Sequence, residues 1–227
     1  LDVVAGLLAD AEAMAGATCA RLGLGIPGSI SPRTGLIRNA NSVYLNGRPF
    51  GEDLETRLAR PVRLANDANC FALSEAMDGA GAGARIVFGI ILGTGVGGGL
   101  IVDGRVVSGP NAITGEWGHN PLPWPRANEY PGPRCYCGRS GCIEMFLCGG
   151  GLKRDYLAET GEALAAEAIV AKAETGEPAA KAVLTRYIER LARATTTLIN
   201  VIDPHVIVLG GGLANIAALY EEVPELW

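Results

Sequence analysis

An α/β fold is the class that this sequence predicts, because short apolar runs alternate along it with longer helical patterns. Hydrophobic residues make up 48% and charged residues 19% of the 227 residues, so the chain can bury a sizeable core. Glycine is unusually frequent, with 32 residues and no strict period. We therefore expect one large domain or two small lobes, with the glycines at tight backbone positions.

The first part of the chain contains two expected strands and three expected helices. Asn and Asp favour helix starts, so the run from Asn66 to Asn69 is expected to cap the third helix. In chain order we expect a helix over residues 1–20, a strand over 21–26, a turn over 27–29, a short helix over 53–58, a strand over 62–65, and the third helix continuing to Met77.

The second part follows a glycine-containing hinge candidate at residues 80–84, which divides the chain into lobes of residues 1–84 and 85–227. Pro204 is expected to end the last long helix of this part. In chain order we expect strands over 86–92 and 100–102 around a glycine-rich turn, a loop-rich stretch over 109–141, helices over 163–174 and 179–202, a buried strand over 206–209, and a glycine turn over 210–212 that leads into a further helix.

Charge and hydropathy exclude several partners. The formal net charge is −5 with no basic block, which argues against nucleic acid or anionic lipid as a partner. The longest uncharged run, residues 86–102, holds six glycines and is expected to form strands rather than a membrane helix. No signal peptide is recognised, so the cytoplasm is the expected compartment. Both ends fall within helical patterns, and we expect the chain to be part of a larger protein.

A Cys and His cluster predicts a structural zinc site. Cys135, Cys137 and Cys142 are spaced C-x-C-x4-C, and His119 precedes them. Three thiolates and one imidazole form a closed tetrahedral shell of the kind that suits structural zinc. The alternatives are unrelated small core residues or a reactive thiol pair, but three thiols so close together in a hydrophilic loop would invite oxidation.

Two glycine-rich turns are candidates for phosphate binding. Residues 93–99 join two hydrophobic strands, and successive backbone N–H groups in such a turn can bind anionic oxygens, with Thr94 adding a hydroxyl. The pattern is not a Walker loop, and a tight structural turn is the alternative. Residues 210–212 stand between a buried strand and a helix, where nucleotides often bind.

Acid–base candidates lie at two places. Asp67 follows a strand end, where an aspartate can accept the proton of a substrate hydroxyl that attacks a phosphoryl group, with Asn66 orienting that hydroxyl. A plain helix cap is the alternative. Zinc would bring Glu116, His119 and Glu144 together, and their side chains suit neighbouring hydroxyls of a sugar. One ring nitrogen of His119 is expected on zinc and the other towards the sugar.

These motifs resemble those of a known family. The segments GEWGH at residues 115–119 and CYCGRSGCIE at 135–144 are similar to the signature of the ROK family (repressors, open reading frames, kinases). LANDAN at 64–69, the glycine turn at 93–99 and VLGGG at 208–212 match its catalytic, second phosphate and adenosine motifs. The family's first phosphate loop and its final helices are absent, and we attribute this to truncation.

The resemblance implies an actin-like (ribonuclease H-like) two-lobed sugar kinase fold, truncated at both ends, that uses ATP and Mg²⁺ and forms a homodimer. Asp67 is then the general base, and the sugar contacts are Gly28, Asn41, Asn66, Asp67, Glu116, His119 and Glu144. The nucleotide contacts are Gly93, Thr94, Gly95, Val96, Gly97, Gly98, Gly210, Gly211 and Gly212.

The identity of the sugar rests on shorter segments. Residues 25–32 and 119–124 look most like fructokinases, which favours fructose phosphorylated on its 6-hydroxyl. Residues 69–75 equally resemble N-acetylglucosamine kinases, and glucose or mannose kinases are further alternatives. A sugar-responsive transcriptional repressor of the same family is the rival class of function.

Overall fold

The computed structural model of the protein describes all residues 1–227 and divides into two compact units. The first comprises residues 1–70 and 108–113, and the second comprises residues 71–107 and 114–227. This division falls within helix α3 (Asp67–Asp78), before the predicted hinge at residues 80–84. The functional lobes at 1–84 and 85–227 therefore remain a prediction, and each compact unit is described by itself.

The first unit combines two small sheets with helices. Strands β1 (Leu22–Ile26) and β4 (Val62–Asn66) pair in parallel, and β2 (Ser29–Ile30) pairs antiparallel with β3 (Ile37–Arg38). Ile26, Ile37 and Ala40 form the centre of its core. Its other elements are α1 (Asp2–Ala15), the 3-10 turn η1 (Val43–Leu45) and α2 (Phe50–Leu58).

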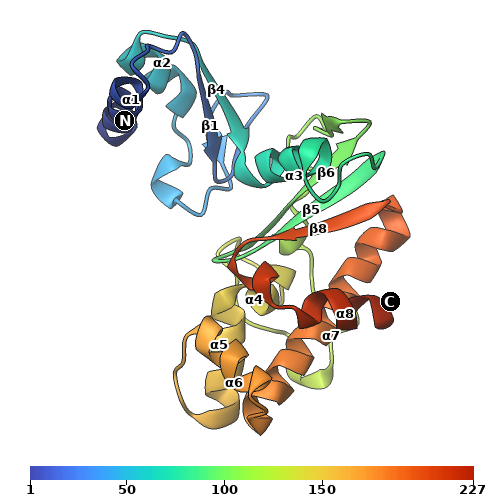
Figure 1. Cartoon of the computed structure of the whole chain (residues 1–227). Coiled ribbons are helices and arrows are strands. Elements are labelled where there is room, and N and C mark those ends of the chain that lie inside the picture. Colours follow the sequence, from blue (N-terminus) through green and yellow to red (C-terminus); the bar gives the residue numbers. More distant parts are fainter. The chain divides into compact units, whose positions relative to one another are not determined.

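The second unit is built on a four-stranded sheet in the order β7-β6-β5-β8. Strands β6, β5 and β8 are labelled in Figure 1. Its strands are β5 (Ile86–Leu92), β6 (Val96–Val102), β7 (Arg105–Val106) and β8 (Val206–Gly210). β5 pairs antiparallel with β6 and parallel with β8. The alternation of strands and helices confirms the predicted α/β class.

Helices cover both faces of this sheet. Ala72 and Ala76 of α3 pack with Val87 of β5, and a methyl group on Gly89 would lie 2.7 Å from the Cβ atom of Ala72, so α3 lies close to the sheet. The larger core lies on the other face, where Phe88 belongs to the cluster. It is completed by α4 (Ile143–Leu147), α5 (Gly149–Thr160), α6 (Ala166–Glu174), α7 (Pro178–Ile202) and α8 (Ala218–Glu225).

Several predicted elements differ in length from the structure, the first helix and the first glycine turn by the most. The first helix ends at Ala15 rather than at residue 20, because Gly16 adopts the left-handed conformation with φ 61°. The glycine turn predicted at residues 93–99 contracts to residues 93–95, since β6 begins at Val96. Gly98 belongs to that strand, and a methyl group there would lie 2.9 Å from Phe88 and Trp117 side-chain atoms. Packing of aromatic rings therefore requires a glycine that the sequence reasoning placed in a loop.

Two helices, α4 and α5, were not expected. Helix α5 begins with three glycines, which are poor helix formers. Gly151 is nevertheless required there, because a methyl group on it would lie 2.7 Å from the carbonyl oxygens of Met145 and Phe146. The thiol of Cys148 caps the helix by accepting the backbone N–H of Gly151 at 3.3 Å. Tertiary contacts therefore override local propensity in this segment.

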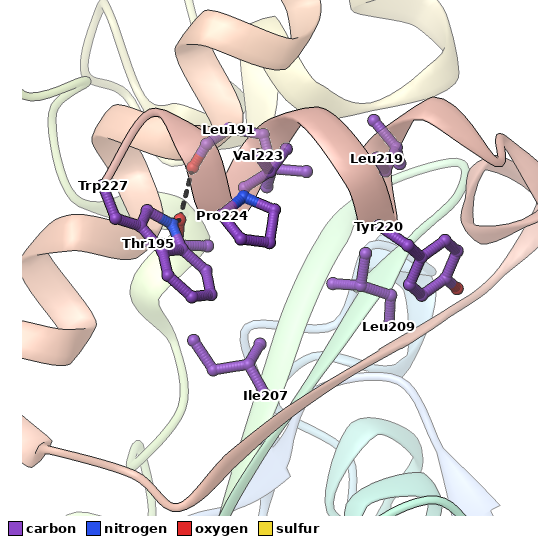
Figure 2. Close-up of a pocket in the computed structure, with 9 residues that line it drawn as sticks. All are labelled: Leu191, Thr195, Ile207, Leu209, Leu219, Tyr220, Val223, Pro224 and Trp227. Carbon is purple, nitrogen blue, oxygen red and sulfur yellow. Dashed lines mark hydrogen bonds between the residues drawn. The ribbon is translucent and has the colours of Figure 1, made fainter.

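An apolar pocket lies between α7, α8 and β8 in the second unit (Figure 2). At its edge Trp227 donates its indole N–H to the hydroxyl of Thr195 at 2.9 Å. None of the residues that the sequence predicts for catalysis, sugar, nucleotide or metal lines this pocket. The pocket is lined by Leu191, Thr195, Ile207, Leu209, Leu219, Tyr220, Val223, Pro224 and Trp227.

No helix of the chain combines the length and the apolar character that crossing a membrane requires.

Candidate functional site

Asp67 and Asn66 lie at the junction of β4 and α3 in the first unit. The Oδ1 atom of Asn66 accepts the backbone N–H of Asn69 at 3.0 Å, so Asn66 is the residue that caps the helix. Asp67 is the first helical residue and its side chain is exposed. Its Oδ1 atom accepts the N–H of Ala68 at 2.9 Å and lies 3.3 Å from the side-chain amide of Asn66. The capping alternative therefore applies to Asn66, and the carboxylate of Asp67 faces solvent.

Gly28, a predicted sugar contact, lies beside the same amide. Asn66 donates its side-chain N–H to the carbonyl oxygen of Gly28 at 3.0 Å. Gly28 has φ 77°, and a methyl group on it would lie 2.5 Å from the carbonyl oxygen of Arg38, so no other residue fits. Asn41 is exposed and follows buried Ala40. The first unit thus joins Gly28 and Asn66 directly.

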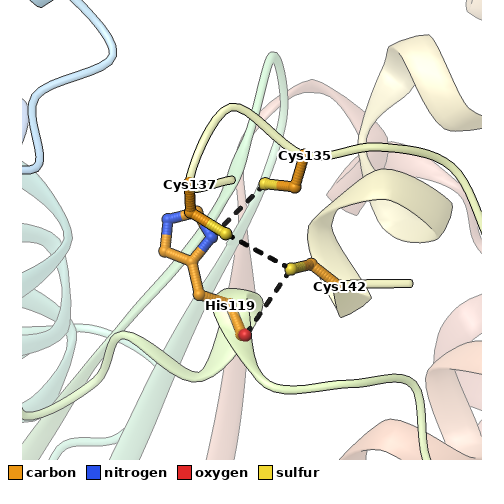
Figure 3. Close-up of side chains that lie close together, drawn as sticks. All are labelled: His119, Cys135, Cys137 and Cys142. Atoms are coloured by element: carbon orange, nitrogen blue, oxygen red, sulfur yellow. Dashed lines mark hydrogen bonds between the residues drawn. The ribbon is translucent and has the colours of Figure 1, made fainter. Parts of the chain in front are cut away.

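The predicted metal ligands come together in the second unit (Figure 3). One ligand atom from each of His119, Cys135, Cys137 and Cys142 lies within 4.8 Å of every other. His119 belongs to the 3-10 turn η2 (Trp117–His119), and Cys142 is the residue before α4. This is the cluster that the C-x-C-x4-C spacing predicts.

Two separations within the cluster match those of a tetrahedral zinc shell. The Sγ atom of Cys135 lies 3.6 Å from Nδ1 of His119, and the Sγ atoms of Cys137 and Cys142 are also 3.6 Å apart. Zinc bonds of about 2.3 Å to sulfur and about 2.0 Å to nitrogen place tetrahedral ligands roughly 3.5–3.8 Å apart. The donor set and its spacing therefore fit zinc. Burial raises the pKa of the Cys135 and Cys142 thiols, the latter to about 12.

The hydroxyl of Tyr136 contacts the second ring nitrogen of His119. We expected this nitrogen to face a sugar. The Tyr136 hydroxyl lies 3.0 Å from Nε2 of His119, and the two rings meet edge to face. Burial, together with the nearby charges of Glu144 and Glu116, raises the pKa of Tyr136, so its hydroxyl stays protonated. Sequence reasoning missed Tyr136, although its place between two ligand cysteines was an available signal.

Glu144 is buried and connects two of the predicted motifs. It lies in the first turn of α4, and its side chain contacts the start of β6. The Oε2 atom accepts the backbone N–H of Val96 at 3.1 Å, and Oε1 lies 3.9 Å from the Sγ atom of Cys135. Glu116 is partly buried just before η2. Glu144 therefore lies beside the predicted metal ligand Cys135, and the grouping of Glu116, His119 and Glu144 around a sugar stays a prediction.

The turn at residues 93–95 is held by segments from elsewhere in the second unit. Gly149 donates its N–H to the carbonyl oxygen of Gly93 at 2.8 Å. The side chain of Trp117 donates to the carbonyl oxygen of Gly97 at 3.1 Å. Thr94 is exposed at the tip of the turn. We call residues 117–149, which carry the predicted metal ligands, the metal-binding segment. These contacts pack that segment against the proposed phosphate turn.

The turn at residues 210–212 follows β8 and leads into η4 (Gly212–Asn215). A methyl group on Gly210 would lie 2.5 Å from the ring of Phe71, and one on Gly211 would lie 2.4 Å from the carbonyl oxygen of Leu92. Gly211 also has φ 86°. Contacts within the sheet and with α3 therefore explain two of its three glycines.

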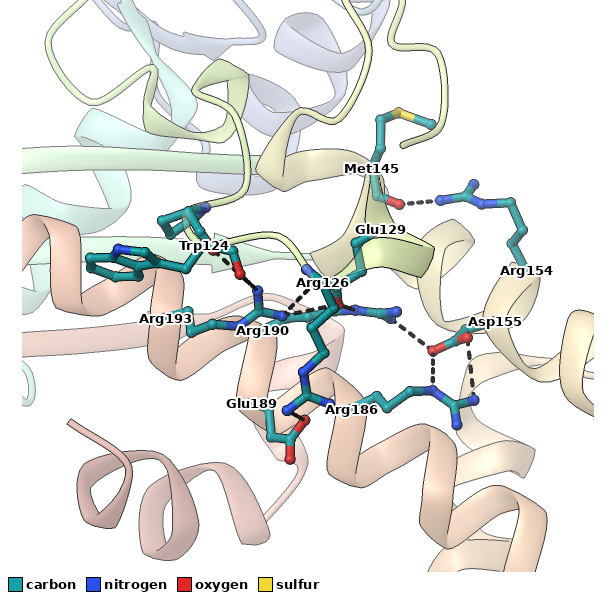
Figure 4. A network of polar contacts seen from close by, with 11 residues as sticks. Trp124, Arg126, Glu129, Met145, Arg154, Asp155, Arg186, Glu189, Arg190 and Arg193 are labelled. Carbon is teal, nitrogen blue, oxygen red and sulfur yellow. Dashed lines mark hydrogen bonds and ion pairs between the residues drawn. The ribbon is translucent and has the colours of Figure 1, made fainter. Parts of the chain in front are cut away.

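A buried ion network supports the loop that precedes the cysteines (Figure 4). Glu129, in the 3-10 turn η3 (Ala127–Glu129), is 4% exposed and accepts from Arg190 at 2.8 Å and from Arg193 at 2.9 Å. Arg190 also reaches Asp155 of α5 at 2.7 Å. Burial by itself would raise the pKa of Glu129. The side chains of Arg190 and Arg193 and the backbone N–H of Arg126 donate hydrogen bonds to its carboxylate, and together they lower the pKa below its usual value. The network fixes this loop to α5 and α7.

The four-stranded sheet with helices on both faces defines an α/β protein, and similarity to solved structures shows that its fold is actin-like (ribonuclease H-like). The sequence profile of the ROK family matches residues 1–227. An N-acetyl-D-glucosamine kinase of Pasteurella multocida (strain Pm70) is 45% identical over 209 residues, which cover 90% of this chain and 69% of that protein. The chain belongs to the ROK family.

Solved structures of the family share the fold. The ROK hexokinase from Thermus thermophilus matches with a TM-score of 0.83 and 32% identity, over 99% of this chain and 74% of that one. A ROK family glucokinase from Streptomyces griseus, in complex with glucose and AMPPNP, matches with a TM-score of 0.81 and 25% identity, over 99% and 75%. A ROK family transcriptional regulator, a homologue of the E. coli MLC protein, matches with a TM-score of 0.80 and 26% identity, over 99% and 60%.

Proposed function

We propose that this protein is an ATP-dependent sugar kinase that phosphorylates N-acetylglucosamine. The relative that is 45% identical is an N-acetylglucosamine kinase, and two of the similar structures are a hexokinase and a glucokinase. The fructose preference of the sequence analysis has no support among these proteins, so N-acetylglucosamine becomes the preferred substrate. Glucose and mannose remain as alternatives.

The single observation that carries this proposal is the exposed carboxylate of Asp67, which the cap provided by Asn66 leaves accessible. Its role is that of a general base. As the sugar hydroxyl attacks the γ-phosphorus of ATP, its proton passes to the Asp67 carboxylate while the bond to the departing ADP oxygen breaks. Asn66 keeps the carboxylate oriented, since its amide lies 3.3 Å from Oδ1 of Asp67.

Two glycines support the nucleotide assignment of the turns. A methyl group on Gly93 or Gly212 would meet no heavy atom within 4 Å, and neither residue has a positive φ. The fold itself therefore does not require glycine at either position. Glycine at these two positions would, however, let a nucleotide approach the backbone closely. We assign ATP to these turns, and Mg²⁺, when bound, neutralises charge on its phosphates.

The sugar contacts that the resemblance implies are kept as proposals, each within its own unit. They are Gly28, Asn41 and Asn66 in the first unit, and Glu116, His119 and Glu144 in the second. Zinc held by His119 and the three cysteines would fix the orientation of the imidazole ring. Tyr136 covers Nε2 of His119, so a sugar that reaches this nitrogen must displace the Tyr136 hydroxyl or bind through it.

Replacing Asp67 by Asn tests the mechanism. We expect kcat to fall by about 10²–10⁴-fold, while the dissociation constant for N-acetylglucosamine changes little, because the amide keeps the shape and loses the base. The measurement is coupled ADP release with N-acetylglucosamine, glucose, mannose and fructose, together with calorimetric sugar binding. Asp78→Asn, at the other end of the same helix and exposed, is the matched control. Near wild-type turnover of Asp67→Asn would refute the role of Asp67.

A sugar-responsive repressor is the competing function, because a transcriptional regulator shares the fold. The same assay separates the two. Sugar-dependent release of ADP by the wild type supports the kinase, and sugar binding without ADP release supports the regulator.

A homodimer is also expected, and sedimentation equilibrium will measure the oligomeric state.

A further inference from the structure

We propose that Glu144 is a positioning residue for the nucleotide turn at residues 93–95, and that it links this turn to the metal cluster. The inference rests on the proposed function, since it takes the turn to bind the phosphates of ATP. It adds a second role to a residue whose sequence motif predicts only a sugar contact.

The contact itself is direct and buried. Glu144 is 8% exposed, and its Oε2 atom accepts the N–H of Val96, 48 residues away, at 3.1 Å. Val96 opens β6 opposite Leu92, the last residue of β5, so this hydrogen bond ties the base of the turn to α4. A buried N–H without an acceptor is costly, so Val96 depends on this carboxylate. The bond therefore anchors the strand residue that directly follows the turn.

The other end of the side chain faces the metal ligands. Oε1 of Glu144 lies 3.9 Å from the Sγ atom of Cys135, and Cys142 is the residue that precedes α4. The carboxylate therefore spans the distance between the cluster and the turn. A displacement of the cysteine loop would move Glu144 and, through it, Val96.

Gly95 shows that the turn accommodates Glu144. A methyl group on Gly95 would lie 2.8 Å from Oε2 of Glu144, and Gly95 has no positive φ that would by itself require glycine. The first atom such a methyl group meets is this carboxylate oxygen. Gly93 differs, because a methyl group there meets nothing within 4 Å. The two glycines thus have separate reasons to be glycine: Gly95 makes room for Glu144, and Gly93 makes room for the nucleotide.

A double-mutant cycle on the full-length protein tests this assignment. The variants are Gly95→Ala, Glu144→Ala and the two combined, and the readout is the dissociation constant for AMPPNP, measured by calorimetry without sugar. Loss of one hydrogen bond predicts a rise of about 3–10-fold in each single variant. Because either change removes the same contact, we expect the double variant to show no more than the larger single effect.

Two comparison variants complete the design. Glu144→Gln keeps an acceptor oxygen for the Val96 N–H and removes a negative charge, so its AMPPNP affinity should equal or exceed that of the wild type. Gly93→Ala should weaken AMPPNP binding independently, and its effect should multiply with that of Glu144→Ala. If Glu144→Ala does not fold, Gly95→Ala carries the test alone, since its backbone accepts alanine.

Several outcomes would overturn the proposal. Full multiplication of the Gly95→Ala and Glu144→Ala effects would mean that Gly95 faces the nucleotide itself. Unchanged AMPPNP affinity in Glu144→Ala would mean that Glu144 does not position the nucleotide turn and contacts only the sugar. If Glu144→Ala does not fold, unchanged affinity in Gly95→Ala would mean the same. A wild type that does not bind AMPPNP would refute the proposed function as well, and the wild-type titration distinguishes this from failure of the positioning role alone.

Discussion

The two glycine turns of the second unit follow neighbouring strands of one sheet, yet different parts of the molecule hold them. The turn at residues 93–95 is fixed by Glu144, which accepts from Val96, and by Gly149, which donates to Gly93. The turn at residues 210–212 is fixed by the ring of Phe71 and the backbone of β5. The first turn therefore depends on the metal-binding segment, and the second depends on the sheet and α3.

The support of the metal-binding segment offers the largest test of this difference. Glu129→Gln removes a buried carboxylate that accepts from Arg190 and Arg193, and it leaves Arg193 without its carboxylate partner and Arg190 with Asp155 alone. We expect the free energy of unfolding to fall by about 3–5 kcal/mol in urea titrations. Amide exchange should accelerate at residues 93–96 more than at 210–212. Equal acceleration in both turns would contradict the comparison.

A control and a pH dependence accompany this variant. Glu189→Gln breaks the partly exposed pair with Arg126 and should cost no more than about 1 kcal/mol. The pKa of Glu129 is lowered in the folded state, so its stabilisation is present above the unfolded pKa and is lost as pH falls through the folded value. The wild type should therefore lose stability below about pH 4.5 through Glu129, and Glu129→Gln should lack this component.

The second turn is best tested at Gly211. Its φ of 86° and ψ of 175° are accessible almost only to glycine, and a methyl group would lie 2.4 Å from the carbonyl oxygen of Leu92. Gly211→Ala should lower the free energy of unfolding by about 2–4 kcal/mol, since backbone atoms cannot move aside easily. Gly212→Ala enters open space and should change stability by less than about 0.5 kcal/mol. Similar losses in both variants would show that contacts within the sheet do not determine this turn.

Sequence reasoning succeeded where the determining residues lie close together in the chain. The cysteine spacing placed Cys135, Cys137 and Cys142 in one cluster with His119, because a short loop permits few other arrangements. The strands beside the glycine turns were found from continuous apolar runs. The α/β class followed from their alternation with helices.

The features that were missed depend on contacts between distant segments. Gly98 pairs with Ile90 within the sheet, and it is glycine because the rings of Phe88 and Trp117 fill the space that a side chain would need. The contact between Glu144 and Val96 joins residues 48 positions apart, and no local pattern encodes it. Tyr136 reaches His119 only once the cysteine loop has folded. Side-chain packing of this kind has no period in the sequence.

Removal of the proposed zinc is the most specific test of the two turns. Chelation should lower the free energy of unfolding, because a ligand that binds only the folded state stabilises that state. Because Glu144 joins the cluster to Val96, amide exchange at residues 93–96 should accelerate on chelation, while residues 210–212 keep their protection.

Cys137→Ser should reproduce this pattern, whereas Cys70→Ser, outside the cluster, should not. Zinc analysis verifies the metal content of each sample. Unchanged exchange at residues 93–96 in verified zinc-free protein would show that the turn is fixed without the cluster, and that Glu144 keeps its place without the metal.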